Sequence, residues 1–119
     1  MEYIQLGNTD IKIPPITFGG NVFGWTADKK QSFYLLDALF DKGFNFIDTA
    51  NVYSYWAPGN SGGESEAIIG EWLDTRKNRD KVIIATKVGS PMGTGAPNLS
   101  VDYINKQIEL SLKRLKTDY

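Results

Sequence analysis

The strongest constraint on the fold of this chain is the alternation of short apolar runs with longer amphipathic segments. The apolar runs cover residues 16–18, 45–50 and 82–88, and the amphipathic segments that follow them cover residues 28–42, 64–77 and 100–115. Strands that are apolar along their length are typical of parallel strands covered by helices. Right-handed crossovers then bring the carboxyl ends of all the strands to one side of the sheet. The sequence therefore predicts an α/β fold.

Capping residues support the three predicted helices. Asp28 and Ser100 suit the position before a first turn, and Gly43 suits the position after a last turn. Apolar residues recur about every three or four positions, so each helix has a face that we expect to lie on the core. The residues predicted for these faces are Phe33, Leu36 and Phe40, then Ala67, Ile68, Trp72 and Leu73, then Val101, Ile104, Ile108, Leu112 and Leu115.

A β-hairpin is predicted ahead of this alternation. Two alternating runs, residues 3–7 and 11–14, flank the turn-forming stretch 8–10, and a proline pair at 14–15 ends the second run. The β/α units that follow fit either an open doubly wound sheet or part of a (β/α)8 barrel. The glycine fingerprints that bind phosphate in open sheets are missing from the sequence, and polar residues at the strand ends favour the barrel.

Composition argues against several classes of function. The chain has 119 residues, enough for one small domain, and 13 Lys and Arg against 14 Asp and Glu give a formal net charge of −1. A nucleic-acid partner would normally require a basic excess. The sequence has no cysteine and no histidine, so thiolate and imidazole metal ligands are excluded. Apolar runs such as residues 82–85 are far shorter than the ~20 residues of a membrane span. The first residues do not resemble a signal peptide, and we expect a cytoplasmic protein without a membrane partner.

Residues with acid–base chemistry lie at the ends of the predicted second and third strands. Asp48 and Lys87 are near the two carboxyl ends, and Tyr53 lies on the loop after Asp48. Because these ends are neighbours in a parallel sheet, the three side chains can converge. A cation within ~4–6 Å stabilises a phenolate, which would make Tyr53 a better proton donor. A structural ion pair beside a loop aromatic accounts for the same residues, and spacing alone leaves both interpretations open.

Four stretches, in this order, resemble the aldo-keto reductases. Residues 45–53 are similar to the second-strand motif of that family, in which an aspartate is followed five positions later by a tyrosine. Residues 63–70 resemble the Gly-x-Ser-Glu segment that opens its second helix, and residues 84–88 resemble its third strand with the catalytic lysine. Residues 111–119 resemble its third helix running into the fourth strand. The loop 55–61 is similar to the longer form in bacterial members related to potassium-channel β subunits.

The resemblance implies that the full protein is a (β/α)8 barrel, with residues 1–119 as the N-terminal portion of that single domain. This portion would hold the hairpin and the first three β/α units. The implied reaction is reduction of an aldehyde or ketone by a hydride from NADPH. Tyr53 would protonate the carbonyl oxygen, Lys87 would ease loss of that proton, and Asp48 would pair with Lys87. The family's catalytic histidine has no counterpart in this sequence, so the 119 residues alone are expected to be inactive.

The resemblance also suggests binding residues around this centre. Gly20 and Asn21, with Asp48, would contact the cofactor, and the alternative for the glycine is simply a tight turn. The loop aromatics that could line a pocket for a small carbonyl substrate, or merely pack the loops, are Trp25, Tyr55 and Trp56.

Three further interpretations stay open at the level of sequence. Glu64 and Glu66 are predicted to complement the positive end of the second helix. A regulatory or binding protein on the same scaffold is an alternative to the enzyme. An inactive truncated fragment is another.

Overall fold

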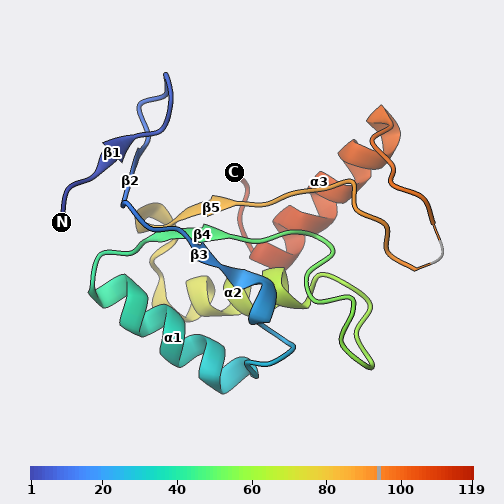
Figure 1. The fold of residues 1–119 in the computed structure, drawn as a ribbon, viewed down its shortest axis with the longest axis horizontal. Coiled ribbons are helices and arrows are strands. Elements are labelled where there is room, and N and C mark those ends of the chain that lie inside the picture. The colour runs from blue at the N-terminus through green and yellow to red at the C-terminus, as the bar shows by residue number, and fades with distance from the viewer. Residues whose placement is uncertain (94) are drawn as a thin grey trace.

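The computed structural model describes residues 1–93 and 95–119. An antiparallel hairpin comes first and parallel strands alternating with helices follow it, as the sequence predicts (Figure 1). The strands are β1 (Ile4–Gln5), β2 (Lys12–Ile13), β3 (Phe18–Gly19), β4 (Phe46–Asp48) and β5 (Ile83–Ala85). The α-helices are α1 (Lys29–Asp41), α2 (Glu64–Arg76) and α3 (Val101–Leu115), and short 3-10 turns cover η1 (Gly20–Val22) and η2 (Arg79–Lys81).

The parallel strands form one sheet in the order β3-β4-β5. Its register pairs Gly19 with Asp48 and Asp48 with Ala85, so the last residues of the three strands lie in one row. The pairing continues past this row, because the Thr49 N–H donates to the Ala85 carbonyl at 2.8 Å. The carboxyl ends of the strands are therefore neighbours, as the predicted topology requires.

The strand β3 begins later than the prediction of residues 16–18. It covers Phe18–Gly19, and Ile16 is exposed instead of lying in the sheet. Pro14 and Pro15 lack the N–H that a sheet ladder needs, so pairing begins only beyond them.

The predicted hairpin is present, and it lies to one side of the sheet (Figure 1). Its register pairs Ile4 with Ile13. The Tyr3 hydroxyl donates to the Gly43 carbonyl at 2.7 Å, and Gly43 lies shortly before β4. The hairpin is thus tied to the amino ends of the parallel strands, opposite the ends that carry Asp48 and Lys87.

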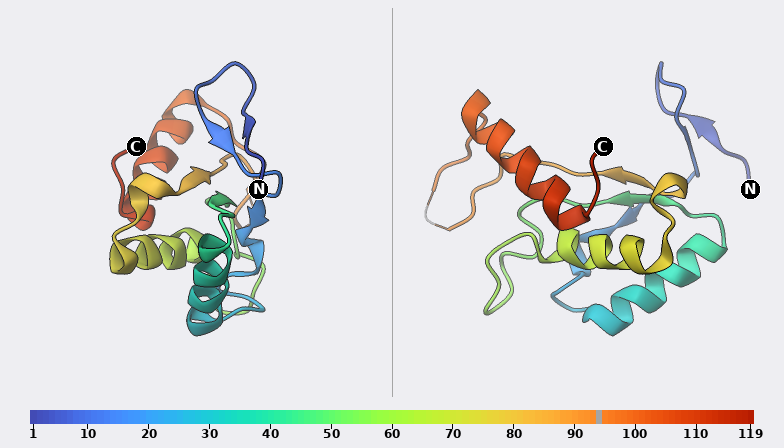
Figure 2. Two further views of the ribbon diagram at one scale, coloured as in Figure 1. Left: turned by 90° about the vertical axis from the view of Figure 1, so that its left-hand side faces the viewer. Right: turned by 180° about the vertical axis from the view of Figure 1, so that it is seen from behind.

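The helices α1 and α2 cover one face of the sheet (Figure 2). As predicted, Asp28 caps α1, with reciprocal bonds between Asp28 and Gln31, and Gly43 after the helix takes a φ of +84°. The indole N–H of Trp72 and the Arg76 guanidinium both bind Asp37 on α1, and the guanidinium lowers the pKa of that carboxyl. The buried core between these layers consists of Phe23, Ala27, Leu36, Ile47, Ile69, Trp72, Leu73, Val82 and Leu115.

The buried face of α2 differs in part from the prediction. Trp72 and Leu73 are buried and Ile68 packs against the core, as expected, but Ile69 is fully buried and Ala67 is only half-buried. The contact with α3 accounts for this rotation, because a Cβ at Gly70 would overlap the backbone oxygen of Arg114. Glycine at this position allows the two helices to approach closely.

The buried face of α3 also differs from the predicted apolar stripe. Its buried residues are Gln107, Ser111 and Leu115, whereas Val101 is 73% exposed and Ile108 is 48% exposed. The close approach at Gly70 is the physical reason, since it turns a side of α3 that carries polar residues toward α2. Of the predicted stripe, Leu115 lies in the core, Ile104 and Leu112 are half-buried, and Val101 and Ile108 are exposed.

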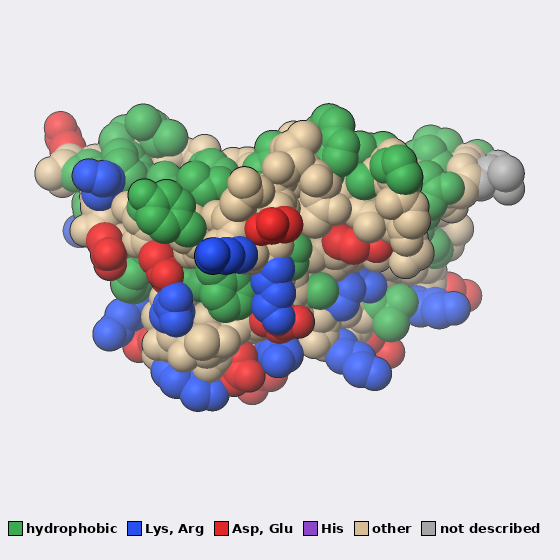
Figure 3. Space-filling model, turned by 90° about the horizontal axis from the view of Figure 1, so that it is seen from below, with side chains coloured by type: hydrophobic (Ala, Val, Ile, Leu, Met, Phe, Trp, Pro, Cys, Tyr) green, Lys and Arg blue, Asp and Glu red, His purple; other side chains and the backbone are tan. Residues whose placement is uncertain are grey.

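The face of the molecule seen from below carries basic and acidic side chains in a mixture (Figure 3). Among the ion pairs of α2, Lys29 pairs with Glu71, and Lys77 pairs with Asp74. In the part of the chain that the structure describes, the helices are all too short or too polar to cross a membrane.

Candidate active site

The ion pair between Asp48 and Lys87 lies at the carboxyl ends of β4 and β5. The Lys87 ammonium donates to Asp48 Oδ1 at 2.8 Å, to Asp48 Oδ2 at 2.7 Å and to the Thr49 carbonyl at 2.7 Å. A lysine ammonium has three protons, so all of them are engaged. The side chains of Lys87 and Asp48 are 49% and 35% exposed, and the pair therefore remains open to the solvent side of the strand ends.

Tyr53 lies against this ion pair, on the loop between β4 and α2. The Lys87 ammonium is 4.8 Å from the centroid of the Tyr53 ring, over its face. The Tyr53 carbonyl accepts the N–H of Gly63 at 3.0 Å and that of Ser65 at 3.2 Å, which fixes the backbone of the loop. Tyr53, Lys87 and Ser90 line part of a hollow of about 220 Å³. The structure thus brings together the three residues that the sequence predicts as a group.

Two of the three predicted pocket aromatics extend from Tyr53. Trp56 packs edge-on against the Tyr53 ring with centroids 5.6 Å apart, and Trp25 packs edge-on against Trp56 at 5.7 Å. Both indoles are about half exposed. Tyr55 lies elsewhere, with its hydroxyl beside Gly93 on the loop after β5.

Gly20 and Asn21 follow β3 in the turn η1. Gly20 is buried, and a Cβ there would lie 3.1 Å from the Asp48 carbonyl and 3.0 Å from Ser65 Oγ. The Asn21 side chain is exposed, while its carbonyl accepts the Ser54 hydroxyl at 3.1 Å. Gly20 thus adjoins Asp48, the other residue predicted to contact a cofactor.

The two glutamates at the start of α2 play different parts. Glu64 accepts the N–H groups of Ser61 at 2.7 Å and Gly62 at 3.0 Å, at the positive end of the helix as predicted. Glu66 also lies in the first turn, as predicted, but it is fully buried and pairs with the Arg114 guanidinium at 2.6 Å, which the sequence does not predict. Burial of an ionised carboxylate requires such a partner, and α3 supplies it.

Sequence reasoning missed three hydroxyl residues that line the inner side of the site. Thr49 and Ser65 are fully buried and their hydroxyl oxygens are 2.9 Å apart. The Thr86 hydroxyl donates to Glu66 at 2.6 Å. The sequence feature that could have indicated Thr49 and Thr86 is their position next to Asp48 and Lys87 at the ends of the predicted strands.

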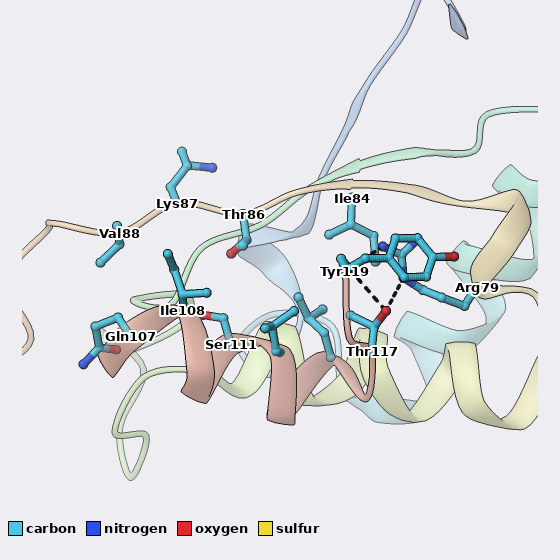
Figure 4. Close-up of a pocket in the computed structure, with 12 residues that line it drawn as sticks. Arg79, Ile84, Thr86, Lys87, Val88, Gln107, Ile108, Ser111, Thr117 and Tyr119 are labelled. Atoms are coloured by element: carbon cyan, nitrogen blue, oxygen red, sulfur yellow. Dashed lines mark hydrogen bonds between the residues drawn. The ribbon is translucent and has the colours of Figure 1, made fainter. Parts of the chain in front are cut away.

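A second hollow, of about 330 Å³, lies between β5 and α3 (Figure 4). Ile84, Ile108 and Ser111 contribute to its walls. At one end the Arg79 guanidinium donates to the Thr117 hydroxyl at 2.9 Å and stacks on the Tyr119 ring at 4.1 Å. The exposed side of Ile108 borders this hollow, which lies on the other side of β5 from the Lys87 ammonium.

Comparisons with known proteins agree on one family. The sequence model described as "Aldo/keto reductase family" matches residues 15–119. An uncharacterised oxidoreductase of Bacillus subtilis is 39% identical over the whole chain, which covers 38% of that protein. An uncharacterised 11.2 kDa protein of Pseudescherichia vulneris is 60% identical over 77% of the chain and 90% of its own length.

Solved structures give the same picture. The holo form of an aldo-keto reductase from Bacillus halodurans superimposes with a TM-score of 0.81 and 32% identity, over the whole chain and 38% of its own length. A putative aldo-keto reductase of a Pseudomonas species gives a TM-score of 0.80 at 33% identity, over 98% of the chain and 42% of its own. The chain therefore spans about two fifths of these structures, and its fold is the hairpin and first three β/α units of a (β/α)8 barrel.

Proposed function

The chain belongs to the aldo/keto reductase family, and on this premise we propose that the full-length protein reduces an aldehyde or a ketone with a hydride from NADPH. The observation that carries the proposal is the cluster of Asp48, Lys87 and Tyr53 at the strand ends. The Lys87 ammonium is held by three hydrogen bonds and lies over the Tyr53 ring. A purely structural ion pair between Asp48 and Lys87 would not need a tyrosine at this position, whereas a proton donor does.

Each of these side chains has a distinct role in the proposed reaction. NADPH, when bound, supplies the hydride that the carbonyl carbon accepts. Tyr53 gives its phenolic proton to the carbonyl oxygen, so that the product is an alcohol and the phenol becomes a phenolate. Lys87 stabilises that phenolate, because a cation within ~4–6 Å favours the ionised form. Asp48 and the Thr49 carbonyl hold the ammonium in place.

The residues at the site fit the ribose side of a nicotinamide nucleotide. Asp48 is about one third exposed, and a carboxylate has about four acceptor positions, of which Lys87 uses two. It can therefore also accept from a ribose hydroxyl. The exposed amide of Asn21, next to Gly20, can donate or accept in the same region. The three protons of Lys87 are engaged, so we do not assign the phosphates of the cofactor to it.

The substrate side of the proposed site is the aromatic group around Tyr53. Trp56 and Trp25 extend from the ring of the proposed acid and are half exposed, so they can cover an apolar group next to the carbonyl. A small carbonyl compound with an apolar substituent is the substrate class that fits these walls.

The experiment compares the full-length protein with Tyr53→Phe, which keeps the ring and removes the proton. NADPH consumption with an aromatic aldehyde should fall by roughly 10²–10⁴-fold, the usual contribution of a general acid. The matched control is Tyr34→Phe, because Tyr34 is 74% exposed on α1. Turnover by Tyr53→Phe at the wild-type rate would remove Tyr53 from the mechanism. A wild-type protein that binds NADPH without reducing carbonyls would favour a regulatory role.

A further inference from the structure

The first turn of α2 contacts the end of every parallel strand in the sheet. Ser65 and Glu66 are consecutive residues of that turn and both are fully buried. The Ser65 hydroxyl donates to the Gly20 carbonyl at 2.7 Å, just after β3. Since its single proton is used there, the Thr49 hydroxyl, 2.9 Å away at the end of β4, is the donor to Ser65 Oγ.

Glu66 makes the equivalent contact with the third strand. Its Oε1 accepts the Thr86 hydroxyl at 2.6 Å, just after β5, and its Oε2 accepts Arg114 Nε at 2.6 Å. The Arg114 guanidinium also donates to Ser111 on α3 at 3.3 Å. Charge-assisted hydrogen bonds of this length are among the stronger contacts in proteins. Glu66 thus links β5 to α2 and α3 at once.

Every strand-end group held in this way adjoins a residue of the proposed site. Thr49 follows Asp48, and Thr86 precedes Lys87. Ser65 also donates its backbone N–H to the Tyr53 carbonyl at 3.2 Å. Two consecutive residues of one helix therefore hold the backbone segments that carry the proposed acid, cation and carboxylate.

Thr86 and Lys87 point to opposite sides of the strand, as successive strand residues do (Figure 4). The Thr86 hydroxyl points toward the helices, and the Lys87 side chain points away from them. A shift or rotation of the chain at Thr86 therefore moves the Lys87 ammonium directly. Lys87 lies two residues beyond β5, and its carbonyl still accepts the Asn51 N–H at 3.0 Å, so the backbone at Lys87 is paired on the side of β4 while the Thr86 hydroxyl holds the preceding residue to α2.

We propose that Ser65, Glu66, Thr49 and Thr86, here called the strand-end cluster, are positioning residues that set the geometry of Lys87, Asp48 and Tyr53. The proposal rests on the proposed carbonyl reduction. The side chains of the cluster act through the strand ends, and the Thr49 carbonyl also accepts a hydrogen bond from the Lys87 ammonium at 2.7 Å. A displacement of about 1 Å at a catalytic group can cost on the order of 10²-fold in rate, so buried contacts that prevent it bear directly on turnover.

The test exchanges the hydroxyl of Thr86, because this hydroxyl links the end of β5 to the buried Glu66. Thr86→Val keeps the shape and removes the bond to Glu66, whereas Thr86→Ser keeps the hydroxyl. In the full-length protein Thr86→Val should lower kcat about 10-fold and leave the dissociation constant of NADPH within about twofold. Thr86→Ser should restore most of the lost kcat. The matched control is Thr75→Val on the exposed side of α2, which should keep the wild-type kcat.

The same series separates this proposal from the proposed function. If Tyr53→Phe loses turnover and Thr86→Val keeps it within twofold, carbonyl reduction stands and the positioning role is overturned. Failure of Thr86→Ser to recover kcat would also overturn that role. A crystal structure of Thr86→Val decides the matter without any assay. The Lys87 ammonium should move away from at least one Asp48 oxygen, and an unchanged ion pair would contradict the proposal even if the wild-type protein reduces no carbonyl.

Discussion

The strand-end cluster and the exposed apolar residues of α3 differ in polarity and in burial. In the cluster, Ser65, Glu66 and Thr49 are polar and fully buried, and each has a hydrogen-bond partner. On α3, Val101 and Ile108 are apolar, and they are 73% and 48% exposed. Buried polar groups normally destabilise a fold unless they are paired, and exposed apolar groups forgo the stabilisation that burial would bring.

This difference shows in which region the side chains have partners within residues 1–119 and in which region apolar side chains remain open to solvent. At the strand ends, the buried side chains of Ser65, Glu66 and Thr49 have hydrogen-bond partners in one another, in Gly20, in Thr86 and in Arg114. Between β5 and α3, a hollow of about 330 Å³ remains open, and Thr86 and Lys87 are among the residues that line it. The proposed site therefore lies at the border of the two regions. Catalytic groups that must keep one geometry need supporting contacts there, and the strand-end cluster supplies them on the side of α2.

The largest effect on stability should come from the buried glutamate of the cluster. Glu66→Ala leaves the Arg114 guanidinium without its carboxylate, and loss of one partner from a buried ion pair costs about 3–5 kcal/mol. Arg114 is 24% exposed, so we expect the lower end of that range, measured by chemical denaturation of the full-length protein.

Glu64→Ala is the matched control for this prediction, two positions earlier on the same helix. It removes hydrogen bonds to Ser61 and Gly62 near the surface, and a helix-terminal contact of this kind is worth about 1 kcal/mol or less. Equal losses of unfolding free energy for the two variants would mean that burial does not distinguish the glutamates.

A smaller change in free energy is expected for self-association through the strand edges and the exposed apolar residues of α3. A polypeptide limited to residues 1–119 should self-associate and fail to reduce carbonyls, because the free edges of β3 and β5 and the stripe of α3 are open to other copies. Ile108→Lys should weaken this association by about 1–2 kcal/mol, since it removes an apolar side chain from the contact. Sedimentation equilibrium measures the association constants of the unchanged polypeptide and of its Ile108→Lys variant. A monomer at all concentrations, or one that oxidises NADPH with an aldehyde, would contradict the prediction.

The order of elements and the acid–base residues could be predicted from the sequence for simple physical reasons. Asp28 and Gly43 mark the ends of α1 through local backbone requirements, which depend on a few neighbouring residues. Parallel topology then requires Asp48 and Lys87 to meet at adjacent strand ends, wherever the helices lie. These features need no knowledge of packing.

Two of the features that escaped prediction, the buried helix faces and the partner of Glu66, depend on how α2 and α3 approach each other. The close contact at Gly70 determines which faces of both helices are buried, and periodicity does not reveal it. Glu66 looks from sequence like a helix-end charge, because its partner Arg114 is far along the chain. The start of β3 was misplaced because the proline pair before it has no N–H to pair.

The central claim is that Lys87, held by Asp48, assists proton donation by Tyr53. The most direct measurement is kcat for carbonyl reduction by the full-length protein and by Lys87→Met, with the exposed Lys106→Met as control. Lys87→Met removes the cation that lies over the Tyr53 ring and should be slower by roughly 10²-fold or more, whereas Lys106→Met should keep the wild-type kcat. A Lys87→Met protein with the wild-type rate would contradict the claim.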